Sequence, residues 1–170
     1  MDETKFFQLI RQFVSLGSDF NLNKIIEAST NRKASDYPQD EYATIKVSDA
    51  IPFGSPDVVD SDGDGVTFER SIIVSNYAEV RIQFFKGDAY NHAKRLFSAQ
   101  AKENIVQFCF ENGIGIKEAR PAMRIPSLAN SAYENRAFIN FVFWFNDVET
   151  EIINVGNKIN ISVNGRELNW

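Results

Sequence analysis

Residues 137–145 constrain the fold more than any other segment, because Asn140 is the only polar residue in this run of nine. A strand that is apolar on both faces is typical of the centre of a sheet with a layer on each side. The same pattern also fits a strand that has one face covered by a partner. We therefore expect a long central strand here, with the other elements arranged around it.

The remaining periodicity predicts an α+β fold in one domain that spans residues 1–170. Apolar residues at helical spacing predict helices over residues 2–16 and about 89–112, ended by Gly17 and Gly113, and a short helix within 21–28. Further strands are expected at residues 42–47, 66–75, 77–86, 114–118, 151–155 and 158–163, with a hairpin turn at Ser75-Asn76. The expected sheet is mostly antiparallel or mixed, has about five or six strands, and carries the one long helix on it and the N-terminal helix at an edge.

The composition is compatible with a compact protein of a reducing compartment. A chain of 170 residues, 44% hydrophobic, buries roughly 70% of its surface without disulfides. Its single cysteine excludes an intrachain disulfide, and no apolar run reaches the ~20 residues of a membrane-spanning helix. The acidic start of the chain is unlike a secretory signal. We expect a cytoplasmic or virion protein that has no membrane partner.

The single histidine and the single cysteine narrow the catalytic possibilities. On one helix His92 and Cys109 would be about 25 Å apart, too far for a nucleophile and its base. Cys109 lies between two phenylalanines and is expected to be a buried, inert thiol, whereas His92 is expected to be solvated or to cap the helix. Phosphate-binding glycine loops and nucleophile-elbow motifs are absent from the sequence. We expect no enzyme, no catalytic residues and no cofactor.

Residues 49–65 form an acidic, turn-rich segment that we expect to be an insertion loop. Residues 41–70 hold seven acidic and two basic residues, which equals the net charge of −5 of the whole chain. Asp60, Asp62 and Asp64 alternate as in an EF-hand calcium loop, but its last ligand position is Ser71. A solvated loop, an acidic contact surface and a metal site at these three aspartates all stay open.

Residues 117–136 are basic by contrast. Four basic residues there face only Glu118 and Glu134; they are Lys117, Arg120, Arg124 and Arg136. The acidic and basic segments can meet within one fold or between neighbours in a head-to-tail ring, and both alternatives remain. Because no basic stripe runs along the sequence, we expect no sequence-specific nucleic-acid binding, although DNA could pass along such a surface.

Several features occur in a fixed order between residues 70 and 163. A strand pair is followed by a helix with Tyr90, Ala93 and Leu96, by Gly113-Ile114 and a proline-bearing loop, by Tyr133-Glu134-Asn135-Arg136-Ala137 at the start of the aromatic strand, and by the turn Ile152-Ile153-Asn154-Val155-Gly156. This order resembles the neck or tail terminator proteins of tailed bacteriophages. The acidic segment 49–65 has no counterpart in the resemblance.

The resemblance implies a structural virion protein without catalytic residues. Terminators of this kind form rings, usually hexamers, that cap the tail tube and join it to the head-completion (connector) complex, while the genome passes through the lumen. The implied partners are further copies of the chain, the tail tube protein and the head-completion or connector protein. The implied location is the virion, and the host cytoplasm during assembly.

We expect the subunit contacts at the acidic loop, the basic segment and the exposed part of the aromatic strand. The residues expected there are Asp57, Asp60, Asp62, Asp64, Arg120, Arg124, Tyr133, Glu134 and Arg136. Glu134 and Arg136 would fix the start of the strand or a contact through a charge-assisted hydrogen bond. Two alternatives remain: another head–tail adaptor or baseplate protein, and a metal-binding module or hydrolase that uses the carboxylates of residues 57–69.

Overall fold

The fold is given by a computed structural model. It describes residues 3–28, 37–62, 67–125, 127–129, 132–154, 161–163 and 166–168. The chain forms two compact units: unit 1 comprises Met1–Phe53 with Ser75–Asn146, and unit 2 comprises Gly54–Val74 with Asp147–Trp170. The expectation of a single domain stays a prediction.

The helices of the described residues all lie in unit 1. They are α1 (Glu3–Ser18), α2 (Ala89–Ala99) and α3 (Glu103–Glu111), with one 3-10 turn at Leu22–Lys24. Gly17 lies inside α1 and does not end it: a Cβ here would be 2.6 Å from Leu96 Cδ1 and 3.2 Å from Ala99 Cβ. This glycine therefore permits the close packing of α1 on α2. None of these helices has both the length and the apolar character needed to cross a bilayer.

The strands of the described residues form one mixed eight-stranded sheet and two small two-stranded sheets. The central path runs β1-β2-β5-β10-β6, with β3, β4 and β7 paired at its sides; β1 and β2 are parallel, and the other registered pairs are antiparallel. The sheet strands are β1 (Ile25–Glu27), β2 (Tyr42–Val47), β3 (Ile51–Pro52), β4 (Asp57–Asp62), β5 (Thr67–Phe85), β6 (Ile114–Ala119), β7 (Met123–Arg124) and β10 (Arg136–Asn154). The two-stranded sheets are β8 (Ser127–Ala129) with β9 (Ala132–Glu134), and β11 (Ile161–Val163) with β12 (Arg166–Leu168).

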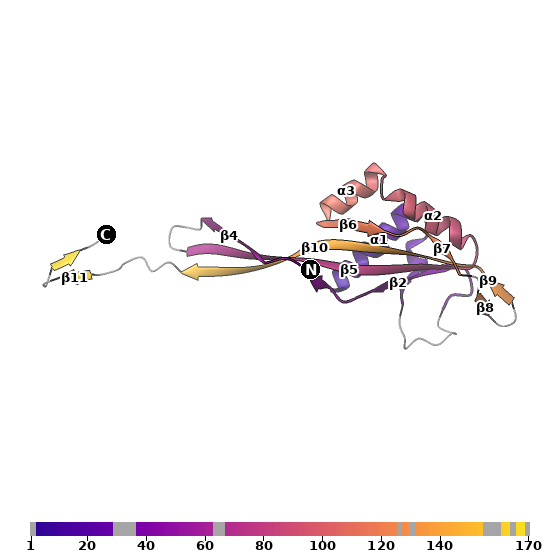
Figure 1. The fold of residues 1–170 in the computed structure, drawn as a ribbon, viewed down its shortest axis with the longest axis horizontal. Coiled ribbons are helices and arrows are strands. Elements are labelled where there is room, and N and C mark those ends of the chain that lie inside the picture. The colour runs from indigo at the N-terminus through magenta and orange to yellow at the C-terminus, as the bar shows by residue number, and fades with distance from the viewer. Residues whose placement is uncertain are drawn as a thin grey trace. The chain divides into compact units, whose positions relative to one another are not determined.

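The core of unit 1 lies between the helices and one face of the sheet (Figure 1). Alternate residues of β10 are fully or almost fully buried on that face, and they are Ala137, Ile139, Phe141, Phe143 and Phe145. The ring of Phe13 on α1 meets Phe141 and Phe143 edge-on at 5.4 and 5.2 Å between centroids. The intervening β10 residues face away from the helices. Among the described residues, helices therefore cover one face of residues 137–145 of β10 and no layer covers the other face, so a layer on each side is not found within the subunit; cover by a partner remains a prediction.

The expected long helix over 89–112 is two helices. The chain turns at residues 100–102, where Lys102 has extended backbone angles, and α3 starts after it. The turn points Ile105 and Cys109 into the core and leaves Phe110 81% exposed, so the prediction of one long helix is wrong. Gly113, with φ +63°, follows the end of α3 as predicted.

Further expectations are corrected, and pairing with distant strands is the physical cause that these corrections share. The hairpin at Ser75-Asn76 does not exist, because β5 is continuous across it and Asn76 is buried. The acidic segment contains β3 and β4, both paired with β5, and β10 extends through the strand expected at 151–155. The sheet thus has eight strands where five or six were expected, and the short helix in 21–28 is a 3-10 turn followed by β1. Strands β2 and β6 lie where predicted.

Candidate functional site

Unit 2 contains a three-stranded ribbon that has no covering layer among the described residues. We define the ribbon as β4 with residues 67–74 of β5 and 147–154 of β10; β4 and β10 flank β5 (Figure 1). Four of its apolar side chains are more than half exposed: Val58 (57%), Val59 (51%), Val148 (59%) and Ile152 (74%). A small ribbon without an apolar layer is marginally stable alone, and clustered exposed apolar groups indicate an interaction surface.

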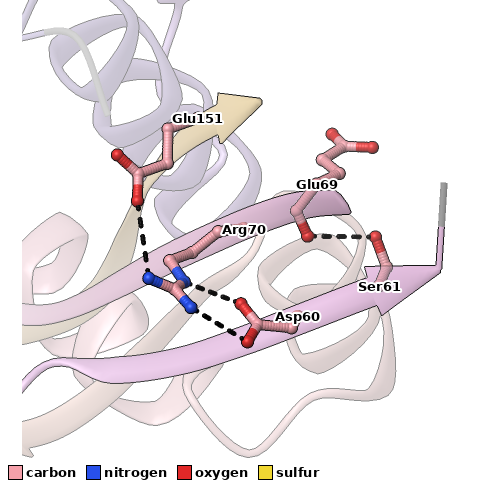
Figure 2. A network of polar contacts seen from close by, with 5 residues as sticks. All are labelled: Asp60, Ser61, Glu69, Arg70 and Glu151. Carbon is pink, nitrogen blue, oxygen red and sulfur yellow. Dashed lines mark hydrogen bonds and ion pairs between the residues drawn. The ribbon is translucent and has the colours of Figure 1, made fainter. Parts of the chain in front are cut away.

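A polar network occupies one face of the ribbon (Figure 2). Arg70 donates from Nε and Nη2 to the two carboxylate oxygens of Asp60, at 2.8 and 3.2 Å, and its Nη1 lies 3.9 Å from Glu151. The hydrogen bond from Arg70 lowers the pKa of Asp60 below its ordinary value. Asp60, predicted as an acidic contact, therefore already has a cross-strand partner in its own chain.

Two of the three aspartates of the predicted metal site, Asp60 and Asp62, lie on a strand where an EF-hand would need a loop. Asp60 and Asp62 both belong to β4, but the side chain of Asp62 and the whole of Asp64 lie outside the described residues. Among the residues described, no three His, Cys, Asp or Glu side chains are grouped so that they could share a metal ion. The bidentate bond to Arg70 also competes for the Asp60 oxygens. The metal interpretation gains no support here.

The other face of the ribbon is apolar with an acidic rim. Because Glu151 reaches Arg70, the alternation of a strand places Val148 and Ile152 on the opposite face. The register of β4 on β5 places Val59 and Ile73 there too. We call these four residues the apolar ribbon face.

Two acidic residues border the apolar ribbon face. In the register of β4 on β5, Asp57 lies opposite Ile73, and Glu69 lies opposite Ser61, which places both acidic residues on this face. Both side chains are exposed, and neither forms an ion pair within the described part of the chain. This face of the ribbon therefore carries two free negative charges beside its exposed valines and isoleucine.

The sheet face of unit 1 that lies away from the helices has the opposite charge, and none of the described residues forms a layer over it. We call it the outer sheet face. Lys46 and Arg81 lie directly opposite each other on β2 and β5. Arg81 donates to Asn140 Oδ1 at 3.2 Å and lies over Phe138, while Lys117 Nζ is 4.7 Å from the ring centroid of Tyr77. None of these three cations has a carboxylate partner among the described residues.

Aromatic groups and two carboxylates complete the outer sheet face. Trp144 lies against Gly115, where a Cβ would be 2.1 Å from the indole Nε1, so that only glycine leaves room for this ring. Phe53 is exposed beside Lys117. Glu118 binds Arg120 at 3.0 Å, and this bond, together with the charge of Glu79, raises the pKa of Arg120. The two carboxylates do not balance the cations of the outer sheet face, which therefore has a net positive charge.

The predicted residues at the start of β10 form a compact cluster. Arg136 binds Glu134 at 2.6 Å and lies over the ring of Phe85, which stacks on Tyr42 at 4.5 Å between centroids. Burial, and then the charge of Glu134, raise the pKa of Tyr42. This arrangement supports a role of Arg136 in fixing the strand's start.

The other predicted contact residues are dispersed. Arg124 lies 4.2 Å from the ring centroid of Tyr90 on α2, and Arg120 is paired with Glu118. Tyr133 belongs to β9, but its side chain lies outside the described residues. An interface role for all of these residues remains a prediction. Sequence reasoning missed Lys46 and Arg81, which only the pairing of β2 with β5 brings together.

The single histidine and the single cysteine are both packed in unit 1. Cys109 is buried as predicted, and burial raises the pKa of its thiol, the opposite of what activates a nucleophile. The His92 side chain is only 16% exposed, so the expectation of a solvated group is wrong. Its ring stacks on Phe84, meets Phe20 edge-on, and has Nδ1 3.2 Å from the carbonyl oxygen of Ser18.

Comparison with known proteins gives one family. The sequence matches a family model described as phage neck terminator protein over residues 5–167, nearly the whole chain. No curated protein matches it.

Proposed function

The chain belongs to the phage neck terminator protein family, and from this we propose that its copies form a ring that caps the tail tube and joins it to the head-completion complex. The family is one of structural proteins of the virion, which agrees with the structural virion protein predicted from the sequence. The proposal adds a closed ring, since a capping role requires an end to polymerisation.

The observation that carries this proposal is the presence of two different uncovered surfaces on one chain. The ribbon of unit 2 exposes apolar and acidic groups, whereas the outer sheet face of unit 1 exposes aromatic groups and unpaired cations. Two unlike patches that fit each other produce head-to-tail contacts, and such contacts close into rings when the rotation between subunits permits. We propose a hexamer, as the resemblance implies.

The proposed partners are the tail tube protein on one side of the ring and the head-completion or connector protein on the other. The proposed locations are the virion and, during assembly, the host cytoplasm. The genome would pass through the lumen without sequence-specific contacts, which fits a chain of net charge −5. The contact residues predicted from the sequence remain candidates for these interfaces, and two of them, Asp57 and Arg124, are exposed and without an ion pair in the described part of the chain.

The solution mass of the purified protein tests the ring. Size exclusion with light scattering should give a species of six times the 19.3 kDa subunit at low salt. At about 1 M salt the screening length falls to about 3 Å, so that a charged interface should dissociate. A subunit that remains monomeric at every salt concentration, and also with purified tail tubes, would contradict the proposal.

A further inference from the structure

We propose that the apolar ribbon face of one copy docks on the outer sheet face of a second copy. This inference rests on the proposed ring and names the two surfaces that would build it. It commits both partners to the same chain, and it assigns the contact to Lys117 of the basic segment together with Lys46 and Arg81, which the sequence did not single out.

The ribbon supplies an apolar surface that needs a cover. Val59, Val148 and Ile152 are each more than half exposed on one face, and the described residues of unit 2 include no helix that could lie on them. Burial of such side chains against a partner removes apolar area from water and stabilises the ribbon at the same time. The opposite face is a poorer candidate, because Arg70 there already binds Asp60 and approaches Glu151.

Charge complementarity selects the outer sheet face as the surface that receives the ribbon. Lys46 and Arg81 are like charges in directly opposed positions, an arrangement that destabilises a strand pair unless an anion lies nearby. Among the described residues of their own chain, no carboxylate forms an ion pair with them or with Lys117, and no cation forms one with Asp57 or Glu69 on the ribbon. Docking would pair these groups and bring the exposed ring of Trp144 against the ribbon's apolar side chains.

Nucleic acid is the less suitable occupant of the same face. Tyr77 and Phe138 each have a cation over the ring, so neither ring is open for a base to stack on. Because the ribbon and the sheet face differ, docking of two copies leaves one free surface of each kind. Further copies then add in the same sense until the ring closes.

Charge reversal with rescue tests the docking. The ribbon variant carries Asp57→Lys and Glu69→Lys, and the sheet-face variant carries Lys46→Glu and Lys117→Glu; all four positions are exposed. Each variant alone should remain a folded monomer by light scattering and circular dichroism. An equimolar mixture should assemble again, because every contact between unlike variants pairs opposite charges. A chain with all four changes should assemble by itself.

The controls separate this inference from the proposed function. A chain with Glu27→Lys and Glu149→Lys has the same charge change as the ribbon variant but leaves both surfaces intact, and should assemble like the wild type. A wild-type ring together with assembling single-surface variants, or with a mixture that stays monomeric, overturns the docking and leaves the ring proposal intact. A wild type that never assembles overturns both. Labelled double-stranded DNA that binds the wild type and not the sheet-face variant, with assembly unchanged, would reassign the face to nucleic acid.

Discussion

The same two strands, β5 and β10, run through both units, but their apolar side chains are buried more deeply in unit 1 than in unit 2. In unit 1, Phe141 and Phe143 are fully buried against α1, whereas Val148 and Ile152 of the same strand are mostly exposed in unit 2. Strand formation therefore does not decide burial in this chain; the presence of a helix layer does. We infer that unit 1 is stabilised within the subunit and that the ribbon depends on assembly.

Truncation of one apolar residue in each unit should give the largest contrast. Phe143→Ala should lower the free energy of unfolding by about 3–5 kcal/mol, because it opens a cavity beside Phe13. Ile152→Ala should cost less than about 1 kcal/mol in the free subunit, since the side chain is already in water. Urea denaturation of the monomer measures both. Equal losses would show that the ribbon has a core of its own.

Thiol reactivity compares the same two environments. Cys109 should react at least about 100-fold more slowly with a disulfide reagent than a Val59→Cys thiol, because it reacts only after local opening. Its raised pKa also keeps the thiolate scarce until a higher pH. The rates are followed by absorbance from pH 7 to 9, with Cys109→Ala as the background for the ribbon thiol. Similar reaction rates for the two thiols in the native subunit would contradict the difference in burial between unit 1 and the ribbon.

The close crossing of α1 and α2 in unit 1 should tolerate no added methyl group. Gly17→Ala places a Cβ 2.6 Å from Leu96 Cδ1, and the overpacking should outweigh the gain in helix propensity, for a net loss of about 1–2 kcal/mol. Gln12→Ala, at an exposed site of the same helix, should change stability by less than about 0.5 kcal/mol. Thermal or urea unfolding compares them, and a stabilised Gly17→Ala chain would contradict the packing described.

The smallest effect is expected at the polar face of the ribbon. Arg70→Gln should return the lowered pKa of Asp60 toward the ordinary value of about 3.9, as followed by carboxyl NMR shifts between pH 2 and 6. A lowered folded-state pKa means that the pair stabilises above the unfolded-state pKa and stops doing so as the pH falls through the folded value. Because both side chains are exposed, overall stability should change little. An unchanged Asp60 midpoint in the variant would show that Arg70 is not the cause.

Local periodicity could predict the elements whose bounds depend on nearby residues alone. The helix expected over residues 2–16 corresponds to α1, and the alternation of residues 42–47 identifies β2. Gly113 marks the end of α3. The break between α2 and α3 has no such signal, because no glycine or proline interrupts residues 100–102. Ser75-Asn76 looks locally like a turn, but pairing of Asn76 with Pro52 of β3 keeps the strand straight through it.

The candidate surfaces were predictable only as charged segments. The sequence shows that residues 57–64 are acidic, but not that Arg70 neutralises Asp60 across a strand pair. It shows Lys46 and Arg81 as isolated residues of two predicted strands, and their like-charge contact exists only once β2 pairs with β5. The order of the sequence features predicted the family, and the match over residues 5–167 confirms it.

Hydrogen exchange tests most directly whether the ribbon depends on assembly. The measurement compares the wild-type ring with the monomeric Lys46→Glu, Lys117→Glu variant, whose ribbon sequence is unchanged. The account predicts that amides of residues 57–62 and 147–154 exchange quickly in the monomer and slowly in the ring, while those of residues 139–143 are slow in both. Ribbon amides that are equally slow in the monomer would contradict it.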